Sequence, residues 1–414
     1  MSFALGVVLF AAALVLSVAW HECGHMWAAQ ATGMKVRRYF VGFGPTLWST
    51  RRGETEYGVK ALPLGGFCDI AGMTPYDEIA AEDRPRAMYL QKPWKRLVVL
   101  AAGPAQNFVL GFLLVVIVGA IFGLPNISQD PVPATVSKVT CVPATTTYYP
   151  DKDPVSTPCG GTGPAGAAGL MAGDTIVAVN GTSVSDYAAV SKQIGDTGGP
   201  VSLTVERTVD GGTEQREFTI DPQPSTVVVN NADGTTETEQ TRKVGITFDP
   251  PPAINHYDGL AVIPASFAFT GDLFVATWDA LLSMPSKISA LWTAVTGGER
   301  SMDTPVSVYG ASVLGGQAVE RGAWSTFLLL LISINFFLGL FNLVPLLPLD
   351  GGHMAIVGYE KARNTVRGWF GRAAGGPVDY LRLMPITYAV VIIMGGFMVL
   401  TLTADIVNPI QLFK

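Results

Sequence analysis

The chain has 414 residues, of which 49% are apolar and 14% are charged, whereas a typical soluble domain has about 25% charged residues. This deficit argues against a wholly soluble protein and indicates a membrane protein. The formal net charge of −6 falls mainly in a central polar segment without a basic cluster, so the composition also argues against a nucleic-acid partner.

Four apolar runs are long enough to cross about 30 Å of hydrocarbon as helices. The first run lacks the basic leader of a secretory signal peptide and continues straight into His21 and Glu22 without a cleavage site. We therefore expect it to stay in the protein as a span. The four expected spans are Phe3 to Trp20 with its continuation, Leu97 to Leu124, Trp324 to Leu349, and Leu383 to Ala404.

The distribution of basic residues orients these spans, because lysine and arginine near span ends are retained in the cytoplasm. Residues 35–96 hold eleven basic and seven acidic residues, whereas residues 124–322 hold ten basic and twenty-one acidic residues. The link between the last two spans is also basic, with Lys361, Arg363, Arg367, Arg372 and Arg382. We expect both termini and the central segment outside the cytoplasm.

After the first span, the segment from Phe40 to Phe67 has strand-like patterning. Two strand-like runs, Thr46 to Thr50 and Thr55 to Ala61, are separated by a turn signal at Arg51-Arg52-Gly53. The apolar, glycine-containing LPLGGF segment at 62–67 follows. The pattern predicts a β-hairpin at the edge of the membrane beside the first span.

The central segment has short strand-like runs separated by turn residues. Its stretch PAGAAGLMAGDTIVAVNG resembles a PDZ domain over roughly 134–250, with an atypical insertion at 141–162. Cys141 and Cys159 flank a Pro-, Thr- and Gly-rich loop within this insertion, and outside the cytoplasm such a pair can form a disulfide. The expected strands are Ala134 to Val139, Thr175 to Val179, Val201 to Arg207, Arg216 to Ile220 and Val244 to Phe248.

The end of the first span carries the sequence HECGH. At 3.6 residues per turn, His21 and His25 lie on one helix face and offer two imidazole nitrogens to one metal ion. Glu22 lies next to them and suits a general base, since zinc lowers the pKa of a water to about 7. The alternative is a pair of helix-end histidines solvated at the interface. Polar groups at membrane depth are expensive, which favours the metal site.

A catalytic zinc usually takes three protein ligands, so a third ligand must come from elsewhere. The third span ends in NLVPLLPLDGGH, where Asp350 is a lone carboxylate after an uncharged run. Pro345 and Pro348 interrupt regular helix there, and we expect irregular backbone to hold Asp350. His353 is the competing ligand, and a simple stop signal for the helix is the alternative interpretation of Asp350.

Together, HECGH, GPAQN at 103–107, NLVPLLPLDGG and the PDZ-like insert resemble the site-2 protease family of intramembrane metalloproteases, particularly its actinobacterial members with one PDZ domain. The resemblance covers nearly the whole chain. It implies one Zn²⁺ per chain held by His21, His25 and Asp350, with Glu22 activating water. It also implies a bacterial plasma-membrane location and single-span membrane protein substrates, commonly anti-sigma factors.

Substrate contacts are expected at three places. The resemblance assigns Asn107 and Asn342 to substrate binding or support of the site, although buried amides in membrane helices also serve as interhelical hydrogen-bond partners. A helical substrate must unwind before cleavage, and the hairpin from Thr46 to Ala61 and the LPLGGF segment are expected to supply an edge that accepts it as an added strand, with Tyr57, Gly58 and Val59 among the contacts. Cys23 and Leu347 depart from the usual family pattern, but neither is a proposed ligand.

The expected fold is therefore an α-helical polytopic membrane protein with four transmembrane helices, a membrane-associated β-hairpin and an inserted, mainly-β, PDZ-like extracytoplasmic domain. Two other functions remain open: a membrane metal transporter, which metal flux into vesicles would reveal, and a non-catalytic PDZ scaffold, which would lack zinc. The expected domains are an N-terminal membrane core at 1–123, the PDZ-like domain at 124–257, an amphipathic membrane-surface linker at 258–322 and a C-terminal membrane core at 323–414.

Overall fold

The computed structural model describes residues 2–127, 132–149, 152–209, 212–230, 236–249 and 252–413. The predicted insertion at 141–162 thus contains two residues, 150 and 151, that lie outside this set. The chain divides into two compact units. The first combines Met1–Ile127 with Asn255–Phe413, and the second is Ser128–Ile254.

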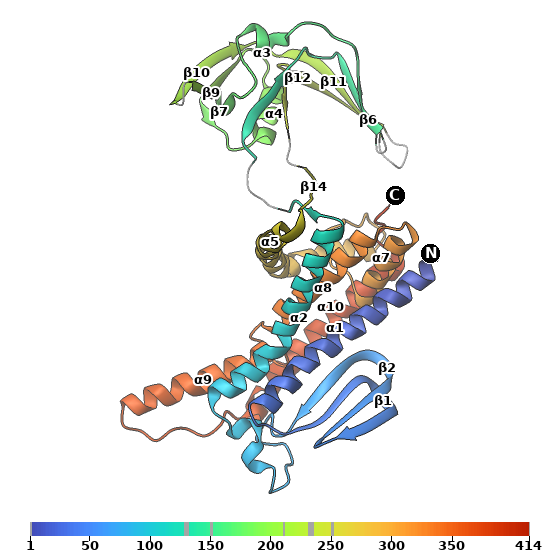
Figure 1. Ribbon diagram of the computed structural model, residues 1–414, viewed down its shortest axis with the longest axis vertical. Helices are drawn as coiled ribbons and strands as arrows, with labels where there is room; N and C mark the ends of the chain where they lie inside the picture. Colours follow the sequence, from blue (N-terminus) through green and yellow to red (C-terminus); the bar gives the residue numbers. More distant parts are fainter. Residues whose placement is uncertain are drawn as a thin grey trace. The chain divides into compact units, whose positions relative to one another are not determined.

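Long apolar helices build the first unit (Figure 1). Within the described residues, five are long and apolar enough to cross a membrane, which makes the protein a multi-pass membrane protein with an additional β-rich unit. Four of them overlap the predicted spans, and the fifth, Gly259–Val295, falls in the predicted surface linker. The helices are α1 (Phe3–Ala31), α2 (Pro93–Ile121), α5 (Val262–Ser283), α6 (Ile288–Val295), α7 (Val308–Glu320), α8 (Trp324–Asn342), α9 (Asp350–Trp369) and α10 (Met384–Val407).

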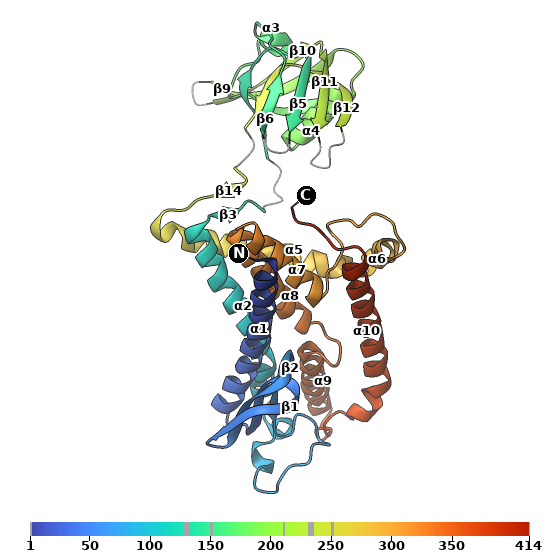
Figure 2. The ribbon, with the colours of Figure 1, turned by 90° about the vertical axis from the view of Figure 1, so that its right-hand side faces the viewer.

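The fifth candidate is divided into α5 and α6 by a short 3₁₀ turn at Met284–Lys287. Figure 2 shows α5 running across the bundle, from the side of α2 toward α6 and α10, instead of alongside α1 and α2. Phe269 of α5 packs against Val115 and Val118 of α2 and Phe336 of α8. Helix α5 thus packs against both α2 and α8.

The two ends of the first unit differ in what they carry. The N-terminus, the C-terminus and the two connections to the second unit, at β3 (Leu124–Pro125) and β14 (Ile254–Asn255), lie at one end, which we call the terminal end (Figure 2). The hairpin of β1 (Val36–Arg52) and β2 (Thr55–Ile70) and helix α9 lie at the other, which we call the hairpin end.

Glycines allow α1 and α2 to pack closely near the hairpin end. A Cβ added to Gly24 would lie 2.3 Å from the carbonyl oxygen of Ala102, and one added to Gly103 would lie 2.3 Å from His25 Nε2. Both distances are far below van der Waals contact. Small residues are the usual means by which membrane helices approach each other, and here they bring the GPAQN segment against HECGH.

The hairpin is wider than two simple strands, because each strand bends and pairs twice. Residues 46–52 pair with 55–60, residues 56–59 also pair with 38–41, and residues 36–41 pair with 66–70. The order across the sheet is therefore 46–52, 55–60, 36–41 and 66–70. The outer segments of this sheet are 46–52 and 66–70, so only these two have an unpaired edge among the described residues.

In this order Tyr57, Gly58 and Val59 do not lie at an open edge, whereas residues 46–52 of the same predicted hairpin and Gly66 and Phe67 of the LPLGGF segment do. Each of the three has a partner on both sides: Tyr57 pairs with Thr50 and with Tyr39, for example. A strand already paired on both sides has no free backbone groups to offer, so strand addition there is excluded.

The third predicted span ends seven residues earlier than expected. Helix α8 stops at Asn342, residues 343–349 form turns around the two prolines, and α9 then begins at Asp350. Asp350 therefore lies in the first turn of a helix, and the expectation of irregular backbone at this residue is wrong. Gly351 and Gly352 allow this start, since a Cβ on either would lie within 2.6 Å of the backbone of residues 343–347.

The second unit contains two sheets. One has the strand order β10-β9-β7-β4-β13 with β8 beside β7, and it encloses a core with Ile176, Leu203 and Val205. Helix α4 (Tyr187–Asp196) packs against it through Val190 and Ile194. The elements are β4 (Ala134–Val139), α3 (Gly163–Ala167), β7 (Thr175–Val179), β8 (Thr182–Ser183), β9 (Val201–Val209), β10 (Gly212–Ile220) and β13 (Ile246–Phe248).

The other sheet of this unit has the order β12-β11-β5-β6 and was not anticipated from the sequence. Its strands are β5 (Thr145–Tyr149), β6 (Lys152–Ser156), β11 (Gln223–Asn230) and β12 (Thr236–Lys243). β5 and β6 lie in the segment that was interpreted as a loop, between Cys141 and Cys159, which are joined by a disulfide. Threonine-rich strands with mostly exposed side chains lack the alternation by which a half-buried strand is recognised.

Candidate metal centre

Two buried imidazoles face one point near the end of α1. His21 and His25 are 6% and 8% exposed, and their Nε2 atoms lie 3.1 Å apart. The Nδ1 atom of His25 lies 2.8 Å from the carbonyl oxygen of Val99 on α2, to which it can donate a hydrogen bond. A histidine that donates from Nδ1 keeps Nε2 as a lone-pair donor, the form in which it binds a metal.

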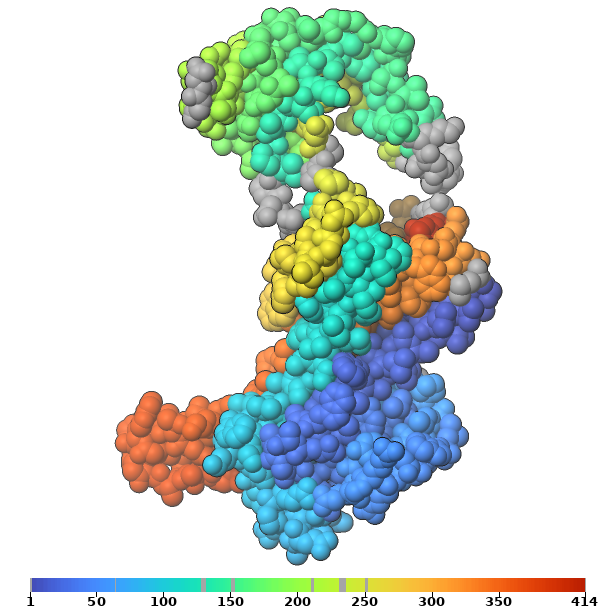
Figure 3. Space-filling model, in the orientation of Figure 1, coloured from blue at the N-terminus to red at the C-terminus, as the bar shows by residue number. Residues whose placement is uncertain are grey.

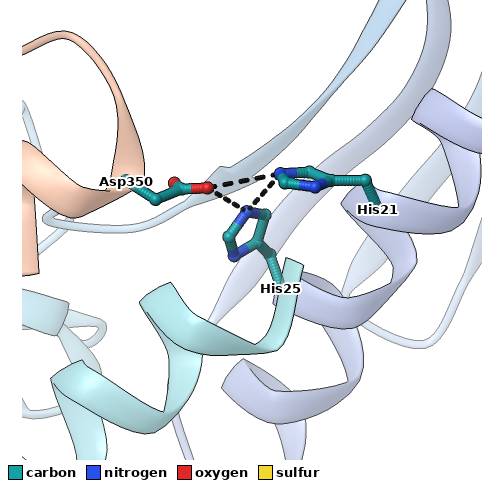
Figure 4. Close-up of side chains that lie close together, drawn as sticks. All are labelled: His21, His25 and Asp350. Atoms are coloured by element: carbon teal, nitrogen blue, oxygen red, sulfur yellow. Dashed lines mark hydrogen bonds and ion pairs between the residues drawn. The ribbon is translucent and has the colours of Figure 1, made fainter. Parts of the chain in front are cut away.

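Asp350 completes the group from the first turn of α9. Its Oδ2 atom lies 3.3 Å from His21 Nε2 and 3.3 Å from His25 Nε2, and Figure 4 shows the three side chains pointing toward one another. Ligands bonded to tetrahedral zinc at about 2.0–2.1 Å are separated by about 3.3–3.4 Å. The donor set and its spacing therefore fit a zinc ion, and among the described residues these three form the group that could hold one.

Asn107 of α2 supports this arrangement from the other side of His21. Its side-chain amide lies 3.1 Å from His21 Nδ1, and it is 1% exposed. Placed with Nδ2 toward the ring, the amide leaves its oxygen without a hydrogen-bond partner. A metal on Nε2 requires the proton on Nδ1, and a turned amide would accept it through Oδ1. The orphaned oxygen is thus explained by a metal-bound His21.

The side chain of Glu22 lies beside the ligand cluster and close to the hairpin. A Cβ on Gly66 would lie 3.5 Å from its Cγ, so the Glu22 side chain lies beside the last segment of β2. Glu22 and the three clustered residues line a single cavity of 370 Å³. The cavity walls also include residues from α2, α8, β2 and the turn before α9: Leu100, Asn107, Leu338, Asn342, Cys68, Ile70, Pro348 and Leu349.

Of the other predicted site residues, one lines the cavity and one lies outside the ligand cluster. Asn342 lines the cavity from the end of α8. His353, the competing ligand, stacks on the ring of Tyr380 and places Nδ1 3.3 Å from its hydroxyl, outside the cluster. Sequence reasoning missed Cys68 and Ile70 as cavity residues, because the strand-like pattern gives no indication of which edge of the hairpin faces α1.

A donor set of two buried histidines and one aspartate, an adjacent glutamate and a surrounding bundle of apolar helices are the features of a membrane-embedded metallopeptidase. Comparison with known proteins identifies the family of metallopeptidase. Residues 9–374 match Peptidase family M50, and the chain belongs to this family of intramembrane zinc proteases. It is similar to zinc metalloprotease Rip1 of Mycolicibacterium smegmatis, with 50% identity over 420 residues that cover 100% of both chains.

More distant relatives carry the same kind of name. Zinc metalloprotease Rip1 of Mycobacterium tuberculosis is 45% identical over 414 residues, again covering 100% of both chains. Metalloprotease MmpA of Caulobacter vibrioides is 25% identical over 397 residues, 89% of each chain. The resemblance to the site-2 protease family, the zinc cofactor and the metalloprotease activity expected from the sequence are confirmed.

Proposed function

We propose that His21, His25 and Asp350 hold the zinc ion of this protease and that Glu22 is its general base. The observation that carries the proposal is the triangle of donor atoms, with sides of 3.1, 3.3 and 3.3 Å. Zinc bound there would supply the Lewis acidity that makes water nucleophilic near neutral pH and polarises the scissile carbonyl.

Glu22 is placed to move the proton. Its carboxylate lies on the cavity wall beside the two imidazoles, within the space that a substrate peptide must enter. It would take a proton from the attacking water and deliver it to the amine nitrogen that leaves. The apolar walls formed by residues such as Leu100 and Leu338 limit bulk water, which strengthens electrostatic interactions in the cavity.

Asn107 is a positioning residue in this scheme. Its amide oxygen accepts the Nδ1 proton of His21 and fixes the ring with Nε2 toward the metal. Its N–H₂ group is then free to donate to a substrate carbonyl at the cavity. Asn342 lines the same cavity from α8 and offers a second amide to the substrate backbone.

The substrate strand is proposed to bind along residues 66–70 of β2. This segment is one of the two free edges of the hairpin sheet, and its Cys68 and Ile70 line the metal cavity. Because the Glu22 side chain lies beside Gly66 of this segment, a peptide added there would pass the general base. Backbone hydrogen bonds to the edge would replace those lost when a helical substrate unwinds.

The proposal also covers the orientation of the protein in the membrane and the class of its substrates. The hairpin end carries the basic residues of 35–96 and of the α9 region, so we place it in the cytoplasm and the second unit outside. The second unit would act as a PDZ-like module that binds or filters substrates. Single-span membrane proteins, with anti-sigma factors as the leading class, would be cleaved after loss of their outer domains.

The ligand roles are tested with the purified protein in detergent. His21→Ala and Asp350→Ala should each lower bound zinc below one ion per chain and abolish cleavage of a single-span substrate. Glu22→Gln should keep the zinc and still lose cleavage, because only the base is removed. Full zinc content and activity in Asp350→Ala would overturn the proposed ligand set.

The binding edge is tested by disulfide trapping in the Glu22→Gln protein. A substrate with one cysteine near its cleavage site should cross-link to the native Cys68. The matched control is Ser49→Cys in a Cys68→Ser background, because Ser49 lies on the other free edge of the same sheet. Cross-linking through residue 49 and not through Cys68 would show that the substrate uses the other edge.

A further inference from the structure

The second half of α9 leaves the folded core. The first half is anchored by Ile356 and Val357, which are buried, and by a buried ion pair between Glu360 and Arg96 of α2, with 2.6 Å between Oε2 and Nη1. From residue 361 to 370 every side chain is half-buried or exposed. Figure 3 shows this part of the chain, in orange, projecting from the first unit. We call Tyr359–Phe370 the α9 arm.

The α9 arm has an exposed apolar stripe. Tyr359, Val366, Trp369 and Phe370 are 59%, 45%, 78% and 76% exposed. At about 100° per residue, these four and Ala362 fall within an arc of about 100°. The anchoring residues Ile356, Val357 and Glu360 point to a different side of the helix. The stripe is thus a second apolar face that no described part of the chain covers.

Positive charge flanks this stripe. Lys361, Arg363, Arg367 and Arg372 are the only charged residues between 361 and 378. None of the four forms an ion pair within the described chain. Arg363 and Arg367 donate hydrogen bonds to the carbonyl oxygens of Gly376 and Ala373, which are neutral acceptors. The α9 arm therefore carries net positive charge that would attract an anionic partner.

The position of the α9 arm in the chain indicates which kind of anionic partner lies near it. It lies between the end of α8 at Asn342 and the start of α10 at Met384, two helices that are long and apolar enough to cross the membrane. Figure 1 shows α9 extending sideways at the hairpin end, across the direction of the bundle. A helix tethered at the foot of two spans, with an aromatic stripe and flanking lysine and arginine, matches an interfacial membrane helix.

We propose that the α9 arm lies in the membrane surface at the hairpin end and binds anionic lipid headgroups. Tyr359, Val366, Trp369 and Phe370 would enter the boundary between headgroups and acyl chains, while Lys361 and the arginines contact lipid phosphates from the flanks. A second copy of the chain would not explain the uncompensated charge, since it would bring the same positive face.

The test uses the full chain, one copy per lipid nanodisc, with brominated phosphatidylcholine as quencher. The emission of Trp369 is obtained as the difference between wild type and Trp369→Phe. We expect bromine to quench this emission, and added phosphatidylglycerol to increase the quenching. Lys361→Gln with Arg372→Gln should remove about half or more of the increase, because each surface charge strengthens binding to anionic lipid.

The matched control is Arg51→Gln with Arg52→Gln, which removes two exposed basic residues from the hairpin turn at the same end. This variant should keep the phosphatidylglycerol effect at Trp369. Emission without quenching would place the arm in water and overturn the proposal. Quenching that does not change when phosphatidylglycerol is added would overturn the preference for anionic lipid. Protection of Trp369 from quenching only in discs with two copies would identify a second chain as the partner.

Discussion

Two aspartates, one in each unit, show how the proposed ligand site differs from a structural ion pair. Asp174 of the second unit is 1% exposed and is surrounded by donors: Arg207 Nε at 2.6 Å, Arg207 Nη2 at 2.7 Å and the Met171 N–H at 2.8 Å. Asp350 of the first unit instead faces the Nε2 atoms of two histidines, at 3.3 Å from each.

The difference is one of electrostatic balance. The carboxylate of Asp174 is neutralised within the protein, so it needs no outside partner and holds β7 to β9. The Oδ2 atom of Asp350 and the two Nε2 atoms converge at 3.1–3.3 Å from one another, a spacing that fits three ligands of one metal ion. Convergent lone pairs, more than burial or charge alone, mark the functional site.

The largest effect should come from Glu22, which takes part in the reaction without holding the metal. Glu22→Gln keeps size and hydrogen bonding but cannot accept the proton. Cleavage of a single-span substrate should fall by about 10²–10⁴-fold, measured as initial rate by gel assay. Zinc content and thermal stability should match those of wild type. A loss of less than tenfold would assign the base to another group.

The same substitution at each of the two aspartates tests directly whether their roles differ. Asp350→Asn should lower zinc affinity strongly while leaving the second unit intact. Asp174→Asn should keep zinc and instead destabilise the second unit by about 3–5 kcal/mol, because Arg207 loses its buried partner. Zinc content by mass spectrometry and hydrogen exchange of β7 and β9 separate the outcomes. If each variant lost both properties, the two units would not be independent.

A smaller effect is expected at Asn107, which contacts a ligand and not the metal. Asn107→Ala should weaken zinc binding by about 10–100-fold, through loss of the hydrogen bond that orients His21. Competition with a chelator measures this change. The matched control is Gln106→Ala on the same turn of α2, since Gln106 makes no side-chain contact with the ligands. Equal weakening in both variants would indicate a general helix defect.

The smallest expected effect is the acid sensitivity of the second unit. Burial alone would raise the pKa of Asp174, but the hydrogen bonds from Arg207 and Met171 outweigh it and hold the pKa below its usual range. Such a carboxylate stabilises the fold fully above the unfolded-state pKa of about 3.9, and this contribution is lost as the pH falls through the lower folded-state pKa.

Hydrogen exchange of β7 and β9 should therefore accelerate below about pH 4 in the wild type. In Asp174→Asn the same strands should exchange faster at neutral pH and show little further acceleration in acid. Glu214→Gln, which removes the same kind of exposed ion pair with Arg216 without changing the charges beside Asp174, should behave as wild type. Acid acceleration that persisted in Asp174→Asn would assign it to other carboxyl groups.

The sequence by itself determined the chemistry and its principal parts. HECGH in an apolar run predicts two histidines on one helix face with a glutamate beside them, because helical periodicity alone fixes that arrangement. The lone Asp350 after the third apolar run and the charge asymmetry between the segments are likewise local properties. These features gave the family, the zinc and the peptidase activity before any packing was known.

Only the tertiary structure decided which edges and ends meet. Residues 57–59 and 66–70 both lie in the predicted hairpin region, and only the double pairing of the strands puts the first between two neighbours and leaves the second at a free edge beside the cavity. Asp350 reaches the imidazoles because α8 stops early and Gly351 and Gly352 let α9 turn back. Such contacts join residues far apart in the chain, so their geometry depends on packing that no local pattern contains.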